Sequence, residues 1–227
     1  MAYTAIKQIE GLNKPIIAVG GTALYIKALL YGLFEGPRSD EKIRALLSKR
    51  AEDKGLEHLY QQLKNIDPMA ANRIHPNDRK RIVRALEVYQ ITGKPISSLQ
   101  KQFEAQKPIH KWNIIGLRRE KTVENRQINA RVKRMIDAGL VEEVKALLAE
   151  DKPLSRQARC AIGYAEIIDY LNGRINLDDT IELVKKNTRR LAKNQRTWFK
   201  TFKNVNWVDI EGGKSPEEIF AHVKTLI

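Results

Sequence analysis

The sequence predicts an α/β fold in which a parallel sheet, incomplete in this chain, carries an inserted all-helical domain. The first observation is an apolar, β-branched run at residues 15–19, followed by Gly20-Gly21-Thr22 and a helical pattern at 23–31. A strand, a glycine turn and a helix in this order are typical of the βα unit of α/β proteins. The second observation is that strand-like runs vanish between residues 39 and 109, where short amphipathic helical patterns follow one another.

Two further strands are predicted, at residues 113–117 and 205–210. Three strands are too few for a self-sufficient doubly wound sheet, so we expect the sheet to be incomplete. The expected domains are residues 1–38 as the first part of the core, residues 39–109 as the inserted helical domain, and residues 110–227 as the second, mostly helical part of the core.

The second part of the core is predicted to hold four helices. The first has Thr122 as its N-cap and ends near Gly139, because hydroxyl residues favour helix starts and glycine favours helix ends. Two shorter helices are predicted at residues 141–149 and 164–171, and a long one from about residue 179 to 202.

The composition points to a polyanionic partner. The 227 residues include 41 Lys and Arg against 27 Asp and Glu, which leaves a net charge of +14. Such a surplus attracts nucleic acid, although a basic but otherwise ordinary enzyme is the alternative. The single cysteine, Cys160, excludes a disulfide framework, and the four scattered histidines form no zinc-ligand pattern. With no long apolar run and no signal-peptide pattern, we expect a cytoplasmic protein with no membrane partner.

The long predicted helix has a dense basic surface. Its apolar residues recur at steps of three and four on one face, and its cations recur in the same way on another. No Asp or Glu lies between Leu183 and Lys203. Because like charges four residues apart repel one another, this helix is predicted to bind a phosphate backbone; a merely solvated basic face is the alternative. The cations are Lys185, Lys186, Arg189, Arg190, Lys193, Arg196, Lys200 and Lys203.

A second basic cluster consists of residues 79–81 and Arg84, directly after Asn77 and Asp78. If Asn77 or Asp78 caps a helix, three cations occupy its first turn, which is the unfavourable end of the helix dipole. An RNA backbone would supply the missing negative charge. The alternative is that Asp78 and solvent offset the cost.

The turn formed by Gly20, Gly21 and Thr22 is a candidate phosphate site. It offers backbone N–H groups and a hydroxyl at a helix N-terminus, which suits phosphate or pyrophosphate. The alternative is that the glycines only provide backbone freedom. Residues 213–215 (Gly-Lys-Ser) are similar to the end of a P-loop, but Val208 stands where the motif needs glycine, so no P-loop is predicted there.

Four motifs in order give the chain a nearly end-to-end resemblance to bacterial tRNA dimethylallyltransferases, also called tRNA isopentenyltransferases. The motifs are Ile16–Lys27, Ile74–Val88 with Thr92–Pro95, Ala161–Glu166 and Thr188–Phe199. The resemblance implies a P-loop-NTPase-like parallel sheet core with an inserted all-helical domain. It also implies transfer of a dimethylallyl group from dimethylallyl diphosphate to N6 of the adenine 3′ of the anticodon. The base is flipped out, Mg²⁺ helps the pyrophosphate leave, and the enzyme is expected to be a monomer that binds the anticodon stem-loop.

The resemblance also implies roles for individual residues. Thr22 would lie in the reaction channel, and Arg131 would hold the pyrophosphate together with Gly20, Gly21 and Thr22. Thr22 and Arg131 are therefore the expected catalytic residues, while no metal ligand is assigned within this chain. Trp198 or Tyr164 could stack on a base, but the favoured expectation is that each fills the core. The expected tRNA-binding residues are Thr22, Arg44, Lys80, Arg81, Arg84, Gly163, Tyr164, Lys193, Gln195, Arg196, Trp198 and Lys200.

The chain departs from the family in three ways. It contains no G-x-x-x-x-G-K-[ST] loop, no Asp in the family's Asp-Ser context, and Asn194 where the family usually has Arg or Lys. We therefore expect an N-terminally truncated form, with Mg²⁺ ligands upstream, that binds tRNA weakly and transfers no prenyl group alone. A non-catalytic RNA-binding module and an adenylate isopentenyltransferase are the alternatives.

Overall fold

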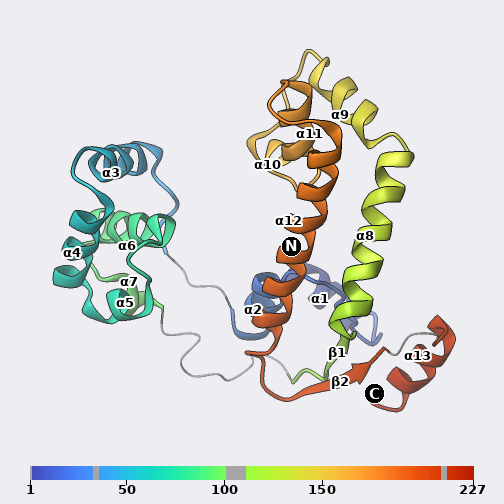
Figure 1. Ribbon diagram of the computed structural model, residues 1–227. Coiled ribbons are helices and arrows are strands. Elements are labelled where there is room, and N and C mark those ends of the chain that lie inside the picture. Colours follow the sequence, from blue (N-terminus) through green and yellow to red (C-terminus); the bar gives the residue numbers. More distant parts are fainter. Residues whose placement is uncertain (1, 33–35, 101–110, 211–213) are drawn as a thin grey trace. The chain divides into compact units, whose positions relative to one another are not determined.

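The computed structural model divides into two compact units (Figure 1). The first unit comprises Met1–Gly20 and Leu24–Trp112, and the second comprises Gly21–Ala23 and Asn113–Ile227. The predicted end of the insertion, residue 109, lies outside the described residues, so the predicted domain boundaries stay predictions. The structure describes residues 2–32, 36–100, 111–210 and 214–227.

The helices α3 to α7 of the first unit share one hydrophobic core. Leu47, Leu59, Ile82 and Val88 are fully buried in it. Asp67 joins two of the helices, because its side chain caps α5 through the N–H of Ala70 at 2.9 Å and also accepts the N–H of Ser97 at 2.8 Å. The helices of this unit are α1 (Ala2–Gly11), α2 (Ala23–Tyr31), α3 (Glu41–Asp53), α4 (Leu56–Ile66), α5 (Pro68–Arg73), α6 (Arg79–Thr92) and α7 (Ile96–Leu99).

Residues 15–19 differ from the prediction: they are not a strand. Ile17 is 76% exposed and Val19 is 93% exposed, although both were expected to be buried in a parallel sheet. The physical reason is that a strand needs a hydrogen-bonding neighbour, and within the described residues β1 (Ile114–Arg118) and β2 (Val205–Asp209) pair only with each other. The predicted helix after the glycine turn is present as α2.

The second unit contains a parallel pair of strands, which confirms the α/β class and both later strand predictions. β1 (Ile114–Arg118) pairs with β2 (Val205–Asp209) in the register Ile114↔Val205 to Arg118↔Asp209. Arg118 closes the pair through two hydrogen bonds to the Asp209 carboxylate, at 2.5 and 2.8 Å. The side chain of Asn113 donates to the backbone carbonyl of Leu226 and so ties the end of the chain to the start of β1.

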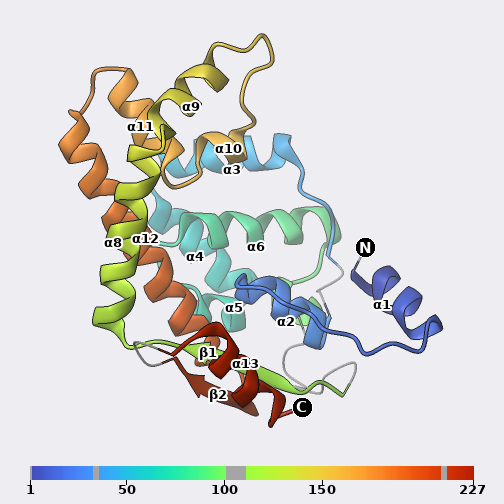
Figure 2. The ribbon, with the colours of Figure 1, turned by 90° about the vertical axis from the view of Figure 1, so that its right-hand side faces the viewer.

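Two long helices, α8 (Lys121–Asp137) and α12 (Leu177–Phe199), run side by side in the second unit (Figures 1 and 2). The predicted N-cap of α8 is wrong: Glu120 caps it instead, by accepting the N–H groups of Thr122 at 2.8 Å and Val123 at 3.0 Å. Buried Leu140, Val144, Ile167 and Ile168 form the local core of α9 and α11. The remaining helices are α9 (Leu140–Leu148), α10 (Arg156–Arg159), α11 (Tyr164–Leu171) and α13 (Pro216–Lys224).

None of the helices in the described ranges has the length and apolar character needed to cross a membrane.

Candidate nucleic-acid interface and glycine turn

The glycine turn is exposed and is held against α12. Gly20, Gly21 and Thr22 are solvent-exposed, while Ala23, the first residue of α2, is only 8% exposed. The side chain of Gln195 on α12 donates its Nε2–H to the carbonyl oxygen of Gly21 at 2.5 Å. The second unit therefore contains Gly21 and Thr22 of the turn together with α12, which anchors Gly21.

The close approach explains the glycine at position 21. A Cβ atom there would lie 2.6 Å from Gln195 Nε2, which no side chain tolerates without displacing the amide. Neither Gly20 nor Gly21 has the positive φ that favours glycine. At position 21, therefore, an added Cβ would have to displace the Gln195 amide, the end of a flexible side chain, while no positive φ distinguishes glycine from other residues there.

The two expected catalytic residues both have uncommitted side chains. Arg131 lies on α8 and Thr22 directly precedes α2; both are exposed. Neither side chain has a hydrogen bond or ion pair with another residue in the described part of the chain. Both side chains are thus available to a ligand. No hydrogen bond or ion pair within the described residues joins Arg131 to the glycine turn.

Three of the eight cations on α12 and just beyond it are engaged within the protein. Lys185 pairs with Glu182 at 2.8 Å, Arg189 donates to Asn129 Oδ1 at 2.5 Å, and Arg196 pairs with Glu124 of α8. The expectation that no acid opposes these cations is therefore wrong for Lys185 and Arg196, while Arg189 binds a neutral amide. The opposing groups come from α8 and from the preceding turn of α12, which a scan of residues 183–203 does not reach. We call Lys185, Arg189 and Arg196 the inner cations.

Four other cations form an exposed strip along α12 and its C-cap. They follow one another at steps of four, three and seven residues, which places them on one face of the helix. No ion pair or hydrogen bond within the described residues engages their side chains. A row of free cations on one helical face is suited to a phosphate backbone. We call Lys186, Arg190, Lys193 and Lys200 the outer strip; Lys203, beyond the helix, is also exposed.

The apolar stripe of α12 changes from buried to exposed along the helix. Val184 is 1% exposed, but Leu191 is 56% and Trp198 is 39% exposed. Core filling, the favoured expectation for Trp198, is therefore wrong, and Trp198 is exposed three residues after Gln195.

The segment before α11 is held by a buried carboxylate that the sequence reasoning missed. Gly163 is buried with φ of +97°, and its N–H donates to Glu166 Oε2 at 2.7 Å. Glu166, 5% exposed, also accepts a hydrogen bond from Asn187 Nδ2 of α12 at 2.6 Å. The spacing of three residues between Gly163 and Glu166 is the available signal, because it is the spacing of a capping box.

Tyr164 is also engaged within the protein. Its hydroxyl donates to Glu143 of α9, and this hydrogen bond, with a smaller effect of burial, raises the pKa of Tyr164. Gly163 and Tyr164, which are both predicted tRNA contacts, are thus already hydrogen-bonded within the protein. The side chains of the outer strip have no such bond within the described residues.

At the N-terminus of α6, acids of the protein offset most of the positive charge. Arg79 pairs with Glu52 at 2.7 Å, and Arg81 pairs with Asp78 at 3.4 Å. Asp78 also caps the helix by accepting the N–H of Arg81 at 3.1 Å. The argument that RNA must supply the missing charge is therefore wrong for these two arginines. Only Lys80, among the described residues of this cluster, has no such partner.

A buried carboxylate, Glu87, holds two of the predicted tRNA contacts. Its oxygens lie 3.0 Å from Arg44 Nε and 2.6 Å from Arg84 Nη1, and one of them accepts the N–H of Asp40 at 2.7 Å. The Glu87 side chain is fully buried. Burial raises the pKa of Glu87, but the hydrogen bonds from Arg84, Asp40 and Arg44 outweigh it and hold the pKa below its ordinary value. We call this arrangement the Glu87 clamp.

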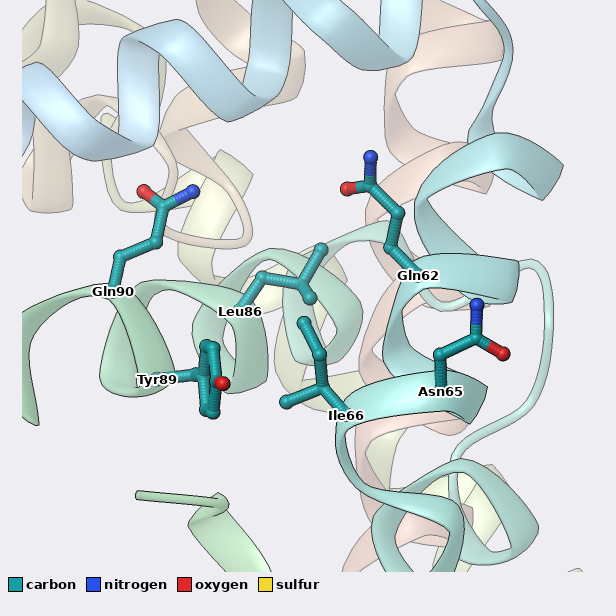
Figure 3. A pocket seen from close by; sticks show the side chains of 6 residues that line it. All are labelled: Gln62, Asn65, Ile66, Leu86, Tyr89 and Gln90. Carbon is teal, nitrogen blue, oxygen red and sulfur yellow. The ribbon is translucent and has the colours of Figure 1, made fainter. Parts of the chain in front are cut away.

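A shallow pocket of about 390 Å³ lies between α4 and α6 (Figure 3). Ile66, Leu86 and Tyr89 form its apolar part, and the amides of Gln62, Asn65 and Gln90 complete its lining. None of the predicted site residues lines it.

No cluster of three or more His, Cys, Asp or Glu able to hold a metal ion occurs in the described ranges. No residue of this chain is assigned to Mg²⁺, and no step is assigned to this ion.

Comparison with known proteins gives one consistent family. Residues 1–202 match the family described as IPP transferase. The tRNA dimethylallyltransferase of Geobacter metallireducens is 43% identical over 211 residues, which cover 93% of this chain and 68% of that protein. The tRNA dimethylallyltransferase of Geobacillus thermodenitrificans is 44% identical over 229 residues, covering 98% and 72%.

Similar solved structures point to the same family. The full-length tRNA isopentenylpyrophosphate transferase of Bacillus halodurans is 35% identical with a TM-score of 0.62, and the match covers 99% of this chain and 70% of that one. A eukaryotic dimethylallyltransferase acting on tRNA is 28% identical with a TM-score of 0.68, covering 92% and 54%.

Proposed function

Because the chain belongs to the IPP transferase family, we propose that it serves in the transfer of a dimethylallyl group from dimethylallyl diphosphate to N6 of the adenine 3′ of the anticodon in tRNA. A cytoplasmic location and a monomeric state are part of this proposal. Its tRNA partner is the anticodon stem-loop.

The observation that carries the proposal is that α12 combines two features. Its outer strip presents four free cations, and its Gln195 side chain holds the glycine turn. The two features lie on different faces of the helix, since Lys193 and Gln195 are two residues apart. The phosphate backbone would follow the outer strip, while a flipped nucleotide would reach past the helix to the turn.

Flipping the adenine out of its stack costs free energy, which contacts between the protein and tRNA must offset. An adenine inside a stack cannot present its N6, and its extrusion costs a few kcal/mol. Phosphate contacts along the outer strip offset this cost. The exposed ring of Trp198, three residues after Gln195, offers a stacking surface for the extruded base.

The reaction develops negative charge on the leaving pyrophosphate. We assign Arg131 to this charge, as the family resemblance implies; its guanidinium is exposed and has no hydrogen bond or ion pair with another described residue. Thr22 would lie beside the target adenine, at the turn that Gln195 anchors.

By itself, this chain would bind tRNA and transfer no prenyl group, since its sequence has neither a Gly-rich phosphate loop nor an Asp in the family's Asp-Ser context. The test is to incubate the chain with unmodified tRNA, radiolabelled dimethylallyl diphosphate and Mg²⁺. We expect tRNA retention on a filter without label in the tRNA. Labelled tRNA would refute the inactivity, and loss of retention would refute the tRNA-binding role.

An adenylate isopentenyltransferase would prefer a free nucleotide. In competition, an excess of AMP should leave tRNA bound, whereas unlabelled tRNA should displace it. Displacement by AMP would favour the nucleotide enzyme instead.

A further inference from the structure

We propose that Gln195 is a positioning residue of the glycine turn and does not contact tRNA. The inference rests on the proposed function in one respect: it takes the glycine turn to bind the substrate. It replaces the tRNA contact that the resemblance implies for Gln195 with a positioning role.

The hydrogen bond between Gln195 and Gly21 fixes the direction of the N–H group of Thr22. The carbonyl of Gly21 and the N–H of Thr22 belong to one planar trans peptide, so they point in opposite directions. Gln195 Nε2 donates to that carbonyl at 2.5 Å. The N–H of Thr22 is therefore directed away from α12, at the start of α2, where an anionic ligand would accept it.

The turn needs such an anchor. Two successive glycines have unusual backbone freedom, so an unanchored turn would sample many orientations of this peptide. Gly21 lies close to the Gln195 side chain, which supplies both atoms that a Cβ at position 21 would meet within 4 Å. The structure therefore couples residues 21 and 195 directly, 174 positions apart in the sequence.

The surroundings of Gln195 do not favour a phosphate contact. Its neighbours on the same face are Leu191 and Trp198, at steps of four and three residues, and both are exposed and apolar or aromatic. The outer strip lies on a different face. A side-chain amide that is already committed to Gly21 has one N–H fewer for RNA.

Two variants with side chains of similar length separate the effect of the Gln195 N–H donor from the effect of side-chain size. Gln195→Met keeps the length and removes the N–H donor, whereas Gln195→Lys keeps a donor that can reach Gly21. In ¹⁵N NMR spectra, Gln195→Met should shift and broaden the backbone amide signals of Gly20, Gly21 and Thr22. Gln195→Lys should leave them close to those of the original protein.

Binding measurements on the same samples distinguish positioning from an RNA contact. Inorganic pyrophosphate, titrated against the turn signals, should bind roughly tenfold more weakly to Gln195→Met, the effect of one hydrogen bond. The tRNA affinity should change less than twofold. A purely structural role would leave the pyrophosphate affinity unchanged at temperatures where both proteins are folded.

A third variant tests the coupling. Gly21→Ala pushes the Gln195 amide away, so Gly21→Ala, Gln195→Ala and the double variant should show similar losses of pyrophosphate affinity. Losses that multiply in the double variant would show independent roles and overturn the proposal. It would also be overturned by unchanged turn signals in Gln195→Met together with a tenfold loss of tRNA affinity. If the original protein binds no tRNA, the proposed function fails, while the NMR signals still decide the role of Gln195.

Discussion

The N-terminus of α6 and the outer face of α12 are both rich in cations, but the protein uses them differently. At α6, Arg79 pairs with Glu52, Arg81 with Asp78, and Arg84 with Glu87. On α12 the four cations of the outer strip are free of such partners within the described ranges. Cation density in a sequence therefore does not identify a nucleic-acid surface. What decides is whether acids from other elements reach the cations.

The distinction extends into α12 itself. Lys193 and Arg196 are three residues apart, yet Lys193 is exposed and Arg196 pairs with Glu124 of α8. The same helix thus contacts α8 through Arg189 and Arg196 and presents the outer strip to solvent. The following predictions test this division.

The largest effect on stability is expected at the Glu87 clamp. Glu87→Gln removes a fully buried charge that faces two arginines, so the first unit should lose roughly 3 kcal/mol of unfolding free energy. Urea unfolding measures this change. A loss below about 0.5 kcal/mol would show that the clamp is only a surface ion pair.

The Glu87 clamp also predicts a pH dependence. The folded state holds the pKa of Glu87 below its ordinary value, so the clamp contributes fully above the pKa of the unfolded chain, about 4.3, and its contribution is lost as the pH falls through the folded pKa. The stability difference between the original protein and Glu87→Gln should therefore be constant near neutral pH and shrink in acid. A difference that grows on acidification contradicts this assignment.

A matched pair on α12 should separate inner from outer cations. Arg196→Gln breaks a half-buried ion pair and should cost about 1.5–3 kcal/mol of stability with little change in the salt dependence of tRNA binding. Lys193→Gln should leave the melting temperature unchanged and lower the slope of log affinity against log salt by about one. The reverse pattern would exchange the two roles.

The smallest effects are expected at α6. Lys80→Gln removes the exposed lysine that has no partner among the described residues of its cluster, and it should weaken tRNA binding by severalfold at low salt. Arg79→Gln removes a surface pair with Glu52 and should cost only about 0.2–1 kcal/mol of stability. If filter binding shows a larger affinity loss for Arg79→Gln, the ion pair in the free protein opens to bind RNA.

The sequence was sufficient where local patterns decide the structure. The strands predicted at 113–117 and 205–210 and the long helix are present, and of the two predicted cap candidates, Asn77 and Asp78, it is Asp78 that caps α6. Residues 15–19 were not predictable in the same way, because an apolar run becomes a strand only beside a partner strand. The Glu87 clamp and the Gln195 anchor were missed since both join residues far apart in the sequence.

The central claim is that the outer strip binds the phosphate backbone of tRNA. The most direct test compares Lys186→Gln/Arg190→Gln/Lys193→Gln/Lys200→Gln with a control of equal charge change, Lys121→Gln/Lys133→Gln/Lys145→Gln/Lys152→Gln, whose exposed lysines lie elsewhere in the second unit. Filter binding over a range of salt concentrations should show the slope of log affinity against log salt falling by roughly three in the first variant, with little change in the control. Equal slopes for the two variants would contradict the account.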